Sequence, residues 1–172
     1  MVIRVSEIEG EVRIKGAVEG LKTPGAEEGA DVVFHTPVEY ELLVRRSGDI
    51  MRVKGSVGCT LTLTCSKCMD EFAFPVDAEL DIELAPKTLM LSASELELKG
   101  EDLDVYYYDG DEIEFDPFIY DEIMLNVPIK PVCGEDCKGL CEVCGANRNH
   151  EECRCAVTAG TLFGEKLKFF LN

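Results

Sequence analysis

The sequence contains no tryptophan and only two histidines, His35 and His150, among its 172 residues. Most hydrolytic sites pair a nucleophile with a histidine base that a third group orients, and no such set is recognisable here. A glycine-rich, phosphate-binding loop is also absent from every expected strand-to-helix junction. We therefore expect a protein that is not an enzyme.

Long apolar runs are missing as well, although 46% of the residues are hydrophobic. No run approaches the roughly eighteen residues that a membrane-spanning helix needs. Residues 1–16 alternate apolar and charged side chains and lack the apolar centre of a signal peptide. These features predict a soluble, cytoplasmic protein, in which free cysteines are the rule and disulfides the exception.

Basic residues are scarce: 17 lysines and arginines stand against 34 acidic residues, for a net charge of −17. The segment Leu91–Glu122 alone holds 12 acidic residues and a single lysine. Because nucleic-acid affinity depends largely on Lys and Arg, this balance argues against a general nucleic-acid-binding protein. An acidic surface often serves solubility alone, and this explanation suffices for most of it.

Cysteine, by contrast, is abundant. Six of the nine cysteines lie between Cys133 and Cys155, with the spacing C-x3-C-x3-C-x2-C-x8-C-x-C. This stretch has so few apolar side chains that burial cannot offset its chain entropy. Disulfides or a bound metal must stabilise it, and for a cytosolic chain zinc is the better interpretation.

The spacing suggests how the thiolates divide. Cys141 and Cys144 are separated by two residues and precede a glycine, as in zinc knuckles. Cys153 and Cys155 follow after eight residues and can complete a closed, tetrahedral four-thiolate site. His150 is within reach as a substitute ligand.

A second C-x2-C pair, Cys65 and Cys68, stands between two expected strands, as in zinc ribbons. Two thiolates are too few for a structural zinc site, and Cys133 and Cys137 are the clustered cysteines that remain. The count therefore favours two structural zinc sites, with Cys59 as a buried core cysteine. The alternative is a single zinc site in the C-terminal segment, with the first pair free or oxidised.

Alternating apolar and polar residues predict strands over much of the chain before the cysteine-rich segment. The expected strand regions are residues 1–22, 32–34, 38–45, 50–57, 57–65 and 72–84. Loops are expected from residue 23 and over the polar stretch 86–100. The Asp109-Gly110 turn predicts a hairpin over residues 105–115.

Asp116, as N-cap, and Pro117, at the first helical position, predict a short helix that ends before Pro128. The expected fold is thus α+β and strand-rich: an antiparallel sheet or partly open barrel, one short helix and a C-terminal zinc-stapled cysteine module. We expect a core domain over residues 1–130, the module over 131–158 and an apolar tail over 159–172.

Four phrases of the sequence occur together in a recognisable order and spacing. They are Leu63–Phe72 (LTCSKCMDEF), Asp116–Leu125 (DPFIYDEIML), Val127-Pro128 and Cys133–Gly145 (CGEDCKGLCEVCG). In these phrases the sequence resembles the YceD family, the large ribosomal RNA subunit accumulation proteins. Glu142 departs from the proline that the family pattern leads us to expect, at a position that does not touch metal.

The resemblance implies a bacterial or organellar factor that is needed for normal levels of large-subunit ribosomal RNA and has no defined catalysis. Direct RNA contact would need a local basic patch. The candidates are Arg45, Arg46, Arg52, Lys54 and Lys67, or Lys130, Lys138, Arg148 and Arg154. Contact through a basic ribosome-assembly protein fits the charge better, and we expect neither a membrane nor a small-molecule substrate.

Two functions of other classes compete with this interpretation. One is a zinc-dependent, protein-binding adaptor without a role in RNA metabolism. The other is a thiol redox protein that uses Cys65 and Cys68. A thioredoxin-type pair, however, opens a helix beside a βαβ unit, whereas the residues on both sides of this pair are expected to form strands.

Overall fold

The computed structural model describes residues 1–19, 21, 33–92 and 105–155. The chain divides into two compact units. The first unit consists of Met1–Leu63 and Phe72–Ile129, and the second consists of Thr64–Glu71 and Lys130–Asn172. The second unit therefore joins two segments that are far apart in the sequence. The expected apolar tail, residues 159–172, lies outside the described residues, and the proposed division at residue 130 stays a prediction.

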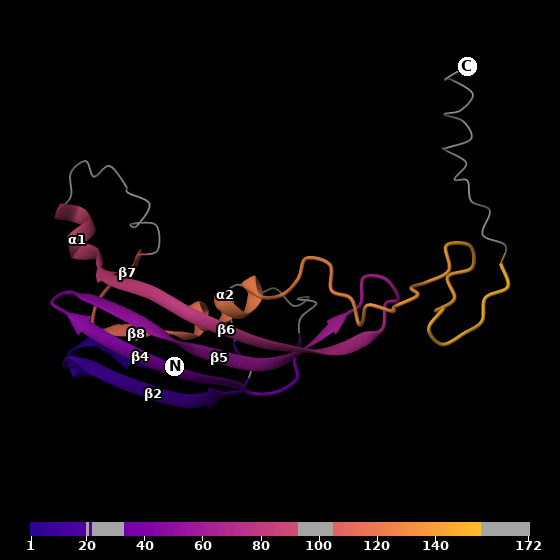
Figure 1. Cartoon of the computed structure of the whole chain (residues 1–172). Coiled ribbons are helices and arrows are strands. Elements are labelled where there is room, and N and C mark those ends of the chain that lie inside the picture. Colours follow the sequence, from indigo (N-terminus) through magenta and orange to yellow (C-terminus); the bar gives the residue numbers. More distant parts are fainter. Residues whose placement is uncertain (20, 22–32, 93–104, 156–172) are drawn as a thin grey trace, which may run out of the picture. The chain divides into compact units, whose positions relative to one another are not determined.

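Strands dominate the first unit (Figure 1). In chain order the elements are β1 (Val2–Arg4), the 3₁₀ turn η1 (Val5–Glu7), β2 (Glu11–Val18), β3 (Val33–Phe34), β4 (Val38–Ser47), β5 (Ile50–Thr64), β6 (Glu71–Pro86), α1 (Lys87–Ser92), β7 (Val105–Tyr108), β8 (Glu112–Glu114) and α2 (Asp116–Leu125).

The main sheet has the strand order β2-β4-β5-β6-β7, with β3 beside β5. β4 runs antiparallel to both β2 and β5, so that Val44 stands opposite Val12 on one side and Val53 on the other. β1 and β8 form a separate two-stranded sheet. The path ends at β2 and β7 without closing, and Figure 1 shows a curled, open sheet. The predicted strand-rich α+β fold is confirmed.

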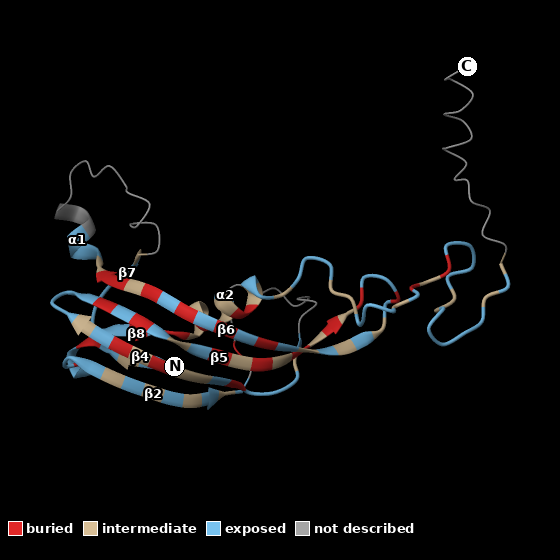
Figure 2. Ribbon diagram, in the orientation of Figure 1, coloured by how far each residue is buried: buried red, intermediate tan, exposed pale blue. Residues whose placement is uncertain are grey.

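One face of the sheet is buried, as the alternating residues require (Figure 2). In β5, Met51 and Val53 are fully buried, whereas Arg52 between them is exposed. Helix α2 contributes Ile119 and Ile123 to the same apolar cluster, and both are fully buried. The first unit thus has a hydrophobic core of its own.

The residues that predicted two strands, 50–57 and 57–65, form the single long strand β5. Gly55 lies within it, at a point where β4 comes unusually close. A Cβ atom at this position would lie only 2.0 Å from the carbonyl oxygen of Glu41. The glycine therefore serves close strand packing and does not interrupt the strand.

The predicted hairpin over residues 105–115 is wrong. β7 pairs in parallel with β6, where Tyr106 lies opposite Leu84, and β8 pairs with β1, where Ile113 lies opposite Ile3. Gly110 does adopt the expected positive φ of 79°. The turn therefore exists, but its two arms pair with different strands because each finds a free edge elsewhere in the fold.

The helix start also differs from the prediction. Phe115 is the N-cap residue of α2, and Asp116 and Pro117 occupy its first turn. The Asp116 carboxylate makes no capping bond and instead forms an ion pair with the terminal ammonium group of Met1. Residues 87–92 of the expected linker form the additional helix α1. Among the described residues, no helix has the length and apolarity needed to cross a bilayer.

Candidate metal centres

The two C-x2-C pairs form two separate turns with the same hydrogen-bond pattern. In Cys65–Asp70, the amide of Met69 donates to the carbonyl of Cys65 at 2.9 Å, and the amide of Cys65 donates to the carbonyl of Asp70 at 2.8 Å. In residues 141–146, Gly145 donates to the carbonyl of Cys141 and Cys141 donates to the carbonyl of Ala146, both at 2.8 Å. The fifth residue of each turn is left-handed.

This left-handed residue reverses the chain just after the second cysteine of each pair. Gly145 has a φ of 74°, whereas Met69 holds a φ of 64° without the freedom of a glycine. Both turns thereby point two sulfur atoms to the same side. We call these turns the first knuckle, residues 65–70, and the second knuckle, residues 141–146.

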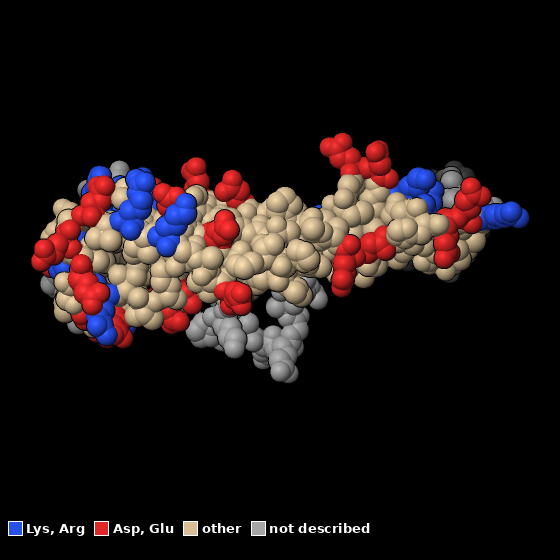
Figure 3. Space-filling view, turned by 90° about the horizontal axis from the view of Figure 1, so that it is seen from below, with Lys and Arg blue, Asp and Glu red and all other residues tan. Residues whose placement is uncertain are grey.

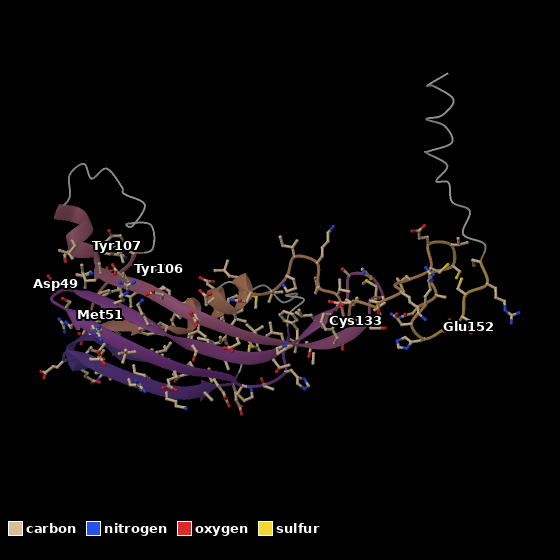
Figure 4. All side chains as sticks on the ribbon, viewed as in Figure 1. Asp49, Met51, Tyr106, Tyr107, Cys133 and Glu152 are labelled. Carbon is tan, nitrogen blue, oxygen red and sulfur yellow. The ribbon has the colours of Figure 1, made fainter. Side chains whose placement is uncertain are left out.

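Each knuckle meets a second cysteine pair. Cys65 and Cys68 lie beside Cys133 and Cys137, and we call these four residues the first site. Its sulfur–sulfur distances include 3.8 Å from Cys65 to Cys137 and 3.7 Å from Cys68 to Cys133. All four sulfur atoms lie within 4.8 Å of one another; Figure 4 labels Cys133.

The second site consists of Cys141, Cys144, Cys153 and Cys155, whose sulfur atoms also lie within 4.8 Å of one another. Cys153 lies 3.5 Å from Cys144 and 3.2 Å from Cys141, measured between sulfur atoms. The structure therefore assembles the same two sets of four cysteines that the sequence spacing suggested. His150 joins neither set.

The sulfur spacing fits a tetrahedral metal ion. Four sulfur atoms at about 2.3 Å from a central ion lie about 3.8 Å from one another along each edge of the tetrahedron. A disulfide would instead bring two sulfur atoms to about 2.05 Å. All nine cysteines are free thiols, and the observed distances of 3.2 to 3.8 Å lie at or somewhat below the edge length of the tetrahedron and far above the disulfide bond length. Both groups are thus placed to hold a metal ion.

Backbone amides favour a thiolate at the first cysteine of each knuckle. Burial alone raises the pKa of the Cys65 thiol, but hydrogen bonds from the amides of Cys133 and Lys67 outweigh it and lower the pKa to about 6. Hydrogen bonds from the amides of Cys144 and Val143 likewise lower the pKa of Cys141 to about 6. Each knuckle therefore presents one ready ligand.

Several of the remaining thiols have raised pKa values, whereas the hydrogen bond from Asn149 lowers the pKa of Cys137. The hydrogen bond to Cys137 raises the pKa of Cys133. Hydrogen bonds to the neighbouring thiols of Cys153 and Cys144 raise the pKa of Cys155 to about 12. Like charges this close oppose one another, so four thiolates can coexist only around a positive ion.

Backbone contacts hold the first knuckle against the C-terminal segment. Ser66 donates to the carbonyl of Pro131, and Leu140 donates to the carbonyl of Lys67, both at 2.8 Å. Gly139, with a φ of 67°, permits this approach, because a Cβ there would lie 3.0 Å from the Lys67 carbonyl oxygen. These contacts bring Cys133 and Cys137 to Cys65 and Cys68.

Polar side chains surround the first site; sequence analysis did not identify Asn147 or Asp70, and it considered His150 only as a metal ligand of the second site. Asn147 donates to both carboxylate oxygens of Asp70 at 2.9 Å and to the carbonyl of Cys68 at 3.2 Å. The Nε2 atom of His150 lies 2.9 Å from Asp70 as well. Hydrogen bonds from Asn147 and His150 lower the pKa of Asp70. In the sequence, the only signal for these contacts is the long spacing of eight residues between Cys144 and Cys153.

Cys59 takes no part in either site. It is buried in the core of the first unit, as predicted, and burial raises the pKa of its thiol.

The two candidate basic patches differ in their surroundings. In the first, Arg52 and Lys54 pair with Asp81, and Arg45 pairs with Glu11. Figure 3 shows acidic and basic side chains interspersed over the first unit. The second patch, which comprises Lys130, Lys138, Arg148 and Arg154, belongs to the second unit together with Lys67 of the first patch. All five side chains are exposed and form no ion pair among the described residues.

Comparison with known proteins extends these observations. The model of the family "Large ribosomal RNA subunit accumulation protein YceD" matches residues 53–167. A protein of Arabidopsis thaliana, named large ribosomal RNA subunit accumulation protein YCED homolog 1, chloroplastic, is 26% identical over 141 residues, which cover 70% of this chain and 44% of that protein. The Zea mays protein of the same name is 28% identical over 143 residues, with coverages of 70% and 49%.

An uncharacterized protein of Mycobacterium tuberculosis is 27% identical over 108 residues, or 63% of this chain and 50% of that protein. The chain thus spans about half the length of the curated relatives it matches. No solved structure matches. Because the family model covers most of the chain, including both cysteine sites, the chain belongs to the YceD family of large ribosomal RNA subunit accumulation proteins.

Proposed function

We propose that this protein is a non-enzymatic factor in the accumulation of large-subunit ribosomal RNA, and hence in ribosome biogenesis, with two structural zinc ions in its second unit. The observation that carries the proposal is the family match over residues 53–167, because this range contains all eight cysteines of the two sites. The names of the Arabidopsis and maize relatives support the same role.

Zinc is the metal that the two donor sets favour. Four thiolates in a tetrahedron are typical of structural zinc sites or of iron–sulfur centres, and zinc requires no redox partner. Catalytic zinc sites usually keep one position open for water or substrate, whereas a four-thiolate set is closed. The donor chemistry thus supports a structural role and agrees with a factor that is not an enzyme.

Metal analysis tests this part of the proposal. The full chain, purified under reducing conditions, should contain two zinc ions. Cys68→Ser and Cys144→Ser, one from each site, should each lower the zinc content from two ions to one. Cys59→Ser is the matched control and should keep both ions. Iron in place of zinc would overturn the choice of metal, and an unchanged zinc content in both variants would overturn the ligand assignment.

For partners, we propose a basic ribosome-assembly protein as the direct contact, so that the effect on ribosomal RNA is indirect. The net charge of −17 supports this, as do the carboxylates that pair with Arg45, Arg52 and Lys54. Direct phosphate contact would need unpaired basic side chains, so it would fall to the exposed lysines and arginines of the second unit and not to Arg45, Arg52 or Lys54. We further propose that the protein works in the cytoplasm, where reducing conditions keep the ligand thiols available.

A deletion strain tests the cellular role. Loss of the protein should lower large-subunit ribosomal RNA relative to small-subunit RNA, and the unmodified chain should restore the ratio. An unchanged ratio would contradict the proposed function and leave a zinc-dependent adaptor as the interpretation. Purification of the tagged protein with and without ribonuclease separates the partner classes: a partner protein that survives ribonuclease supports indirect action, and one that is lost with the RNA opposes it.

The redox alternative rests on the C-x2-C spacing of Cys65 and Cys68, and the low pKa of Cys65 agrees with it. Against it stands the burial of both Cys65 and Cys68, since reactive cysteines are usually partly exposed. Alkylation of the native, metal-loaded protein addresses it directly. We expect no reaction at this pair; rapid and selective modification of Cys65 would favour the redox function.

A further inference from the structure

The eight residues between Cys144 and Cys153 do more than connect two ligands of the second site. We call residues 145–152 the bridging loop. Within this loop, Asn147 reaches the first knuckle: it donates hydrogen bonds to the Asp70 carboxylate at 2.9 Å and to the Cys68 carbonyl at 3.2 Å. The loop thus starts and ends at the second site and contacts the first site in between.

Asn149 reaches the other half of the first site. Its Nδ2 atom lies 3.5 Å from the sulfur of Cys137, and its Oδ1 atom accepts a hydrogen bond from the amide of Lys138 at 2.8 Å. The backbone adds a further link, because Arg148 donates to the carbonyl of Gly139 at 3.0 Å. The bridging loop therefore supports both cysteine pairs of the first site.

Burial does little to hold the conformation of the bridging loop, which depends on hydrogen bonds, including those from the amides of His150 and Glu151 to the carbonyl of Asn147. None of its residues is buried; all are exposed or half-buried. Without metal at the second site, the hydrogen bonds of the second knuckle would still hold the start of the loop, but Cys153 would no longer anchor its end, and placing Asn147 and Asn149 would cost conformational entropy. Metal at the second site anchors the bridging loop through Cys144 and Cys153, so less conformational entropy is lost when the first site binds its ion.

We propose that the bridging loop couples the two metal sites, so that an ion at the second site raises the affinity of the first. The inference rests on the proposed metal sites. Linkage makes the coupling reciprocal, so an ion at the first site strengthens binding at the second by the same factor. Residues that support metal ligands typically contribute about 10–100-fold in affinity, and we expect coupling of this size. Asn147 and Asn149 act as positioning residues.

Zinc titration against a chromophoric chelator tests the coupling. The double variant Cys141→Ser/Cys144→Ser keeps only the first site functional, and Cys65→Ser/Cys68→Ser keeps only the second. The overall constant for loading both ions into the unmodified chain is then divided by the product of the two single-site constants. We expect a ratio of about 10–100. Circular dichroism of the strands confirms that each variant keeps the fold of the first unit.

Variants of the bridging loop test whether the coupling between the two sites passes through this loop. Asn147→Ala, measured with the same pair of single-site backgrounds, should lower the ratio, and Asn147→Ala/Asn149→Ala should bring it close to one. Arg148→Ala is the matched control. Arg148 is the neighbour of Asn147 in the same loop, and its exposed side chain forms no ion pair among the described residues. This control should leave the ratio unchanged.

The outcomes separate the two proposals. Chains that bind no zinc at either site would overturn the metal sites themselves. Two zinc ions bound with a ratio of one would overturn the coupling and leave the metal sites standing. A high ratio that persists in Asn147→Ala would overturn the route through this residue. If Asn147→Ala weakens the first site equally with and without a functional second site, Asn147 supports that site locally and the coupling is likewise overturned.

Discussion

Single residues decide how the knuckles turn. Both knuckles require a left-handed residue in the fifth position, which Gly145 supplies without strain and Met69 supplies despite its side chain. A left-handed backbone costs a residue with a Cβ about 1–2 kcal/mol. The Met69 side chain is 62% exposed, so little packing is available to offset this cost.

The left-handed positions predict opposite effects in the two knuckles. Met69→Gly should stabilise the second unit by up to about 1 kcal/mol, because the glycine relieves the strain but loses more chain entropy. Gly145→Ala should destabilise it by about 1–2 kcal/mol. Neither change removes a ligand. Resistance of bound zinc to guanidinium, followed with a chelator dye, measures both effects.

Gly134→Ala provides the control for these variants, because Gly134 lies in the same unit, has open space around it and does not have a positive φ. It should be nearly neutral. Destabilisation by Met69→Gly would contradict the strain argument.

Asp111 links η1 to the turn before β8 and makes the stability of the first unit depend on pH. Its carboxylate accepts hydrogen bonds from the hydroxyl and the amide of Ser6, which lower the pKa of Asp111. A carboxyl group whose pKa is lower in the folded state stabilises the fold above its unfolded pKa. This stabilisation is lost as the pH falls through about 4 towards the lower folded value.

Asp111→Asn should therefore lower the thermal midpoint at neutral pH and have a smaller effect near pH 3. Thermal unfolding followed by circular dichroism across this range measures the difference. Glu9→Gln is a suitable control, since Glu9 is exposed and forms no ion pair among the described residues. An equal loss at both pH values for Asp111→Asn would count against a charge-dependent bond.

At the scale of elements, β5 organises the first unit because it is central in the sheet order and pairs with β4 from Ile50 to Gly58. Its two glycines differ in their surroundings. A Cβ at Gly55 would meet the β4 backbone at 2.0 Å, whereas the nearest atom to a Cβ at Gly58 is the Val76 carbonyl oxygen at 3.8 Å.

These two positions form a matched pair of variants. Gly55→Ala should destabilise the first unit by about 1–3 kcal/mol or more, because the β4 backbone must move. Gly58→Ala should be neutral or stabilise the unit by about 0.5 kcal/mol, since alanine has less chain entropy to lose. Urea unfolding followed by circular dichroism compares them. Similar urea midpoints for the two variants would contradict the prediction and show that the backbones of β4 and β5 move apart at Gly55 at little cost.

At the scale of the whole molecule, the two units differ in what stabilises them. The first unit buries large apolar side chains such as Phe115, Leu42 and Leu80. The buried hydrophobic residues of the second unit, among those described, are Cys65, Cys68 and Cys141, all proposed ligands. The second unit should therefore depend on metal and the first should not.

Chelation provides the test. Removal of metal under reducing conditions should make eight thiols reactive, while Cys59, buried in the core of the first unit, stays protected. The strand signal in circular dichroism should persist, and restored zinc should protect the eight thiols again. Loss of the strand signal together with the metal would show that the first unit depends on the second.

Local sequence patterns predicted the structure correctly where a segment's own residues determine its conformation. Alternating residues identified the strands, the C-x2-C spacing with a following glycine identified the second knuckle, and the position between two strands identified the first cysteine pair as zinc-ribbon-like. The predictions failed where a choice between distant partners was involved. The Asp109-Gly110 turn formed, but β7 and β8 paired elsewhere, and Asp116 found an ion pair in place of a capping role.

The sequence by itself determined the strand-rich fold, the family and the grouping of cysteines into pairs, because these depend on residues close together in the chain. Only the tertiary structure decided which side chains surround the first site and which basic residues are neutralised. Asn147 and Asp70 are far apart in the sequence yet hydrogen-bonded, and Arg52 meets Asp81 from a different strand. Such contacts depend on how the chain folds back on itself, and no local pattern encodes them.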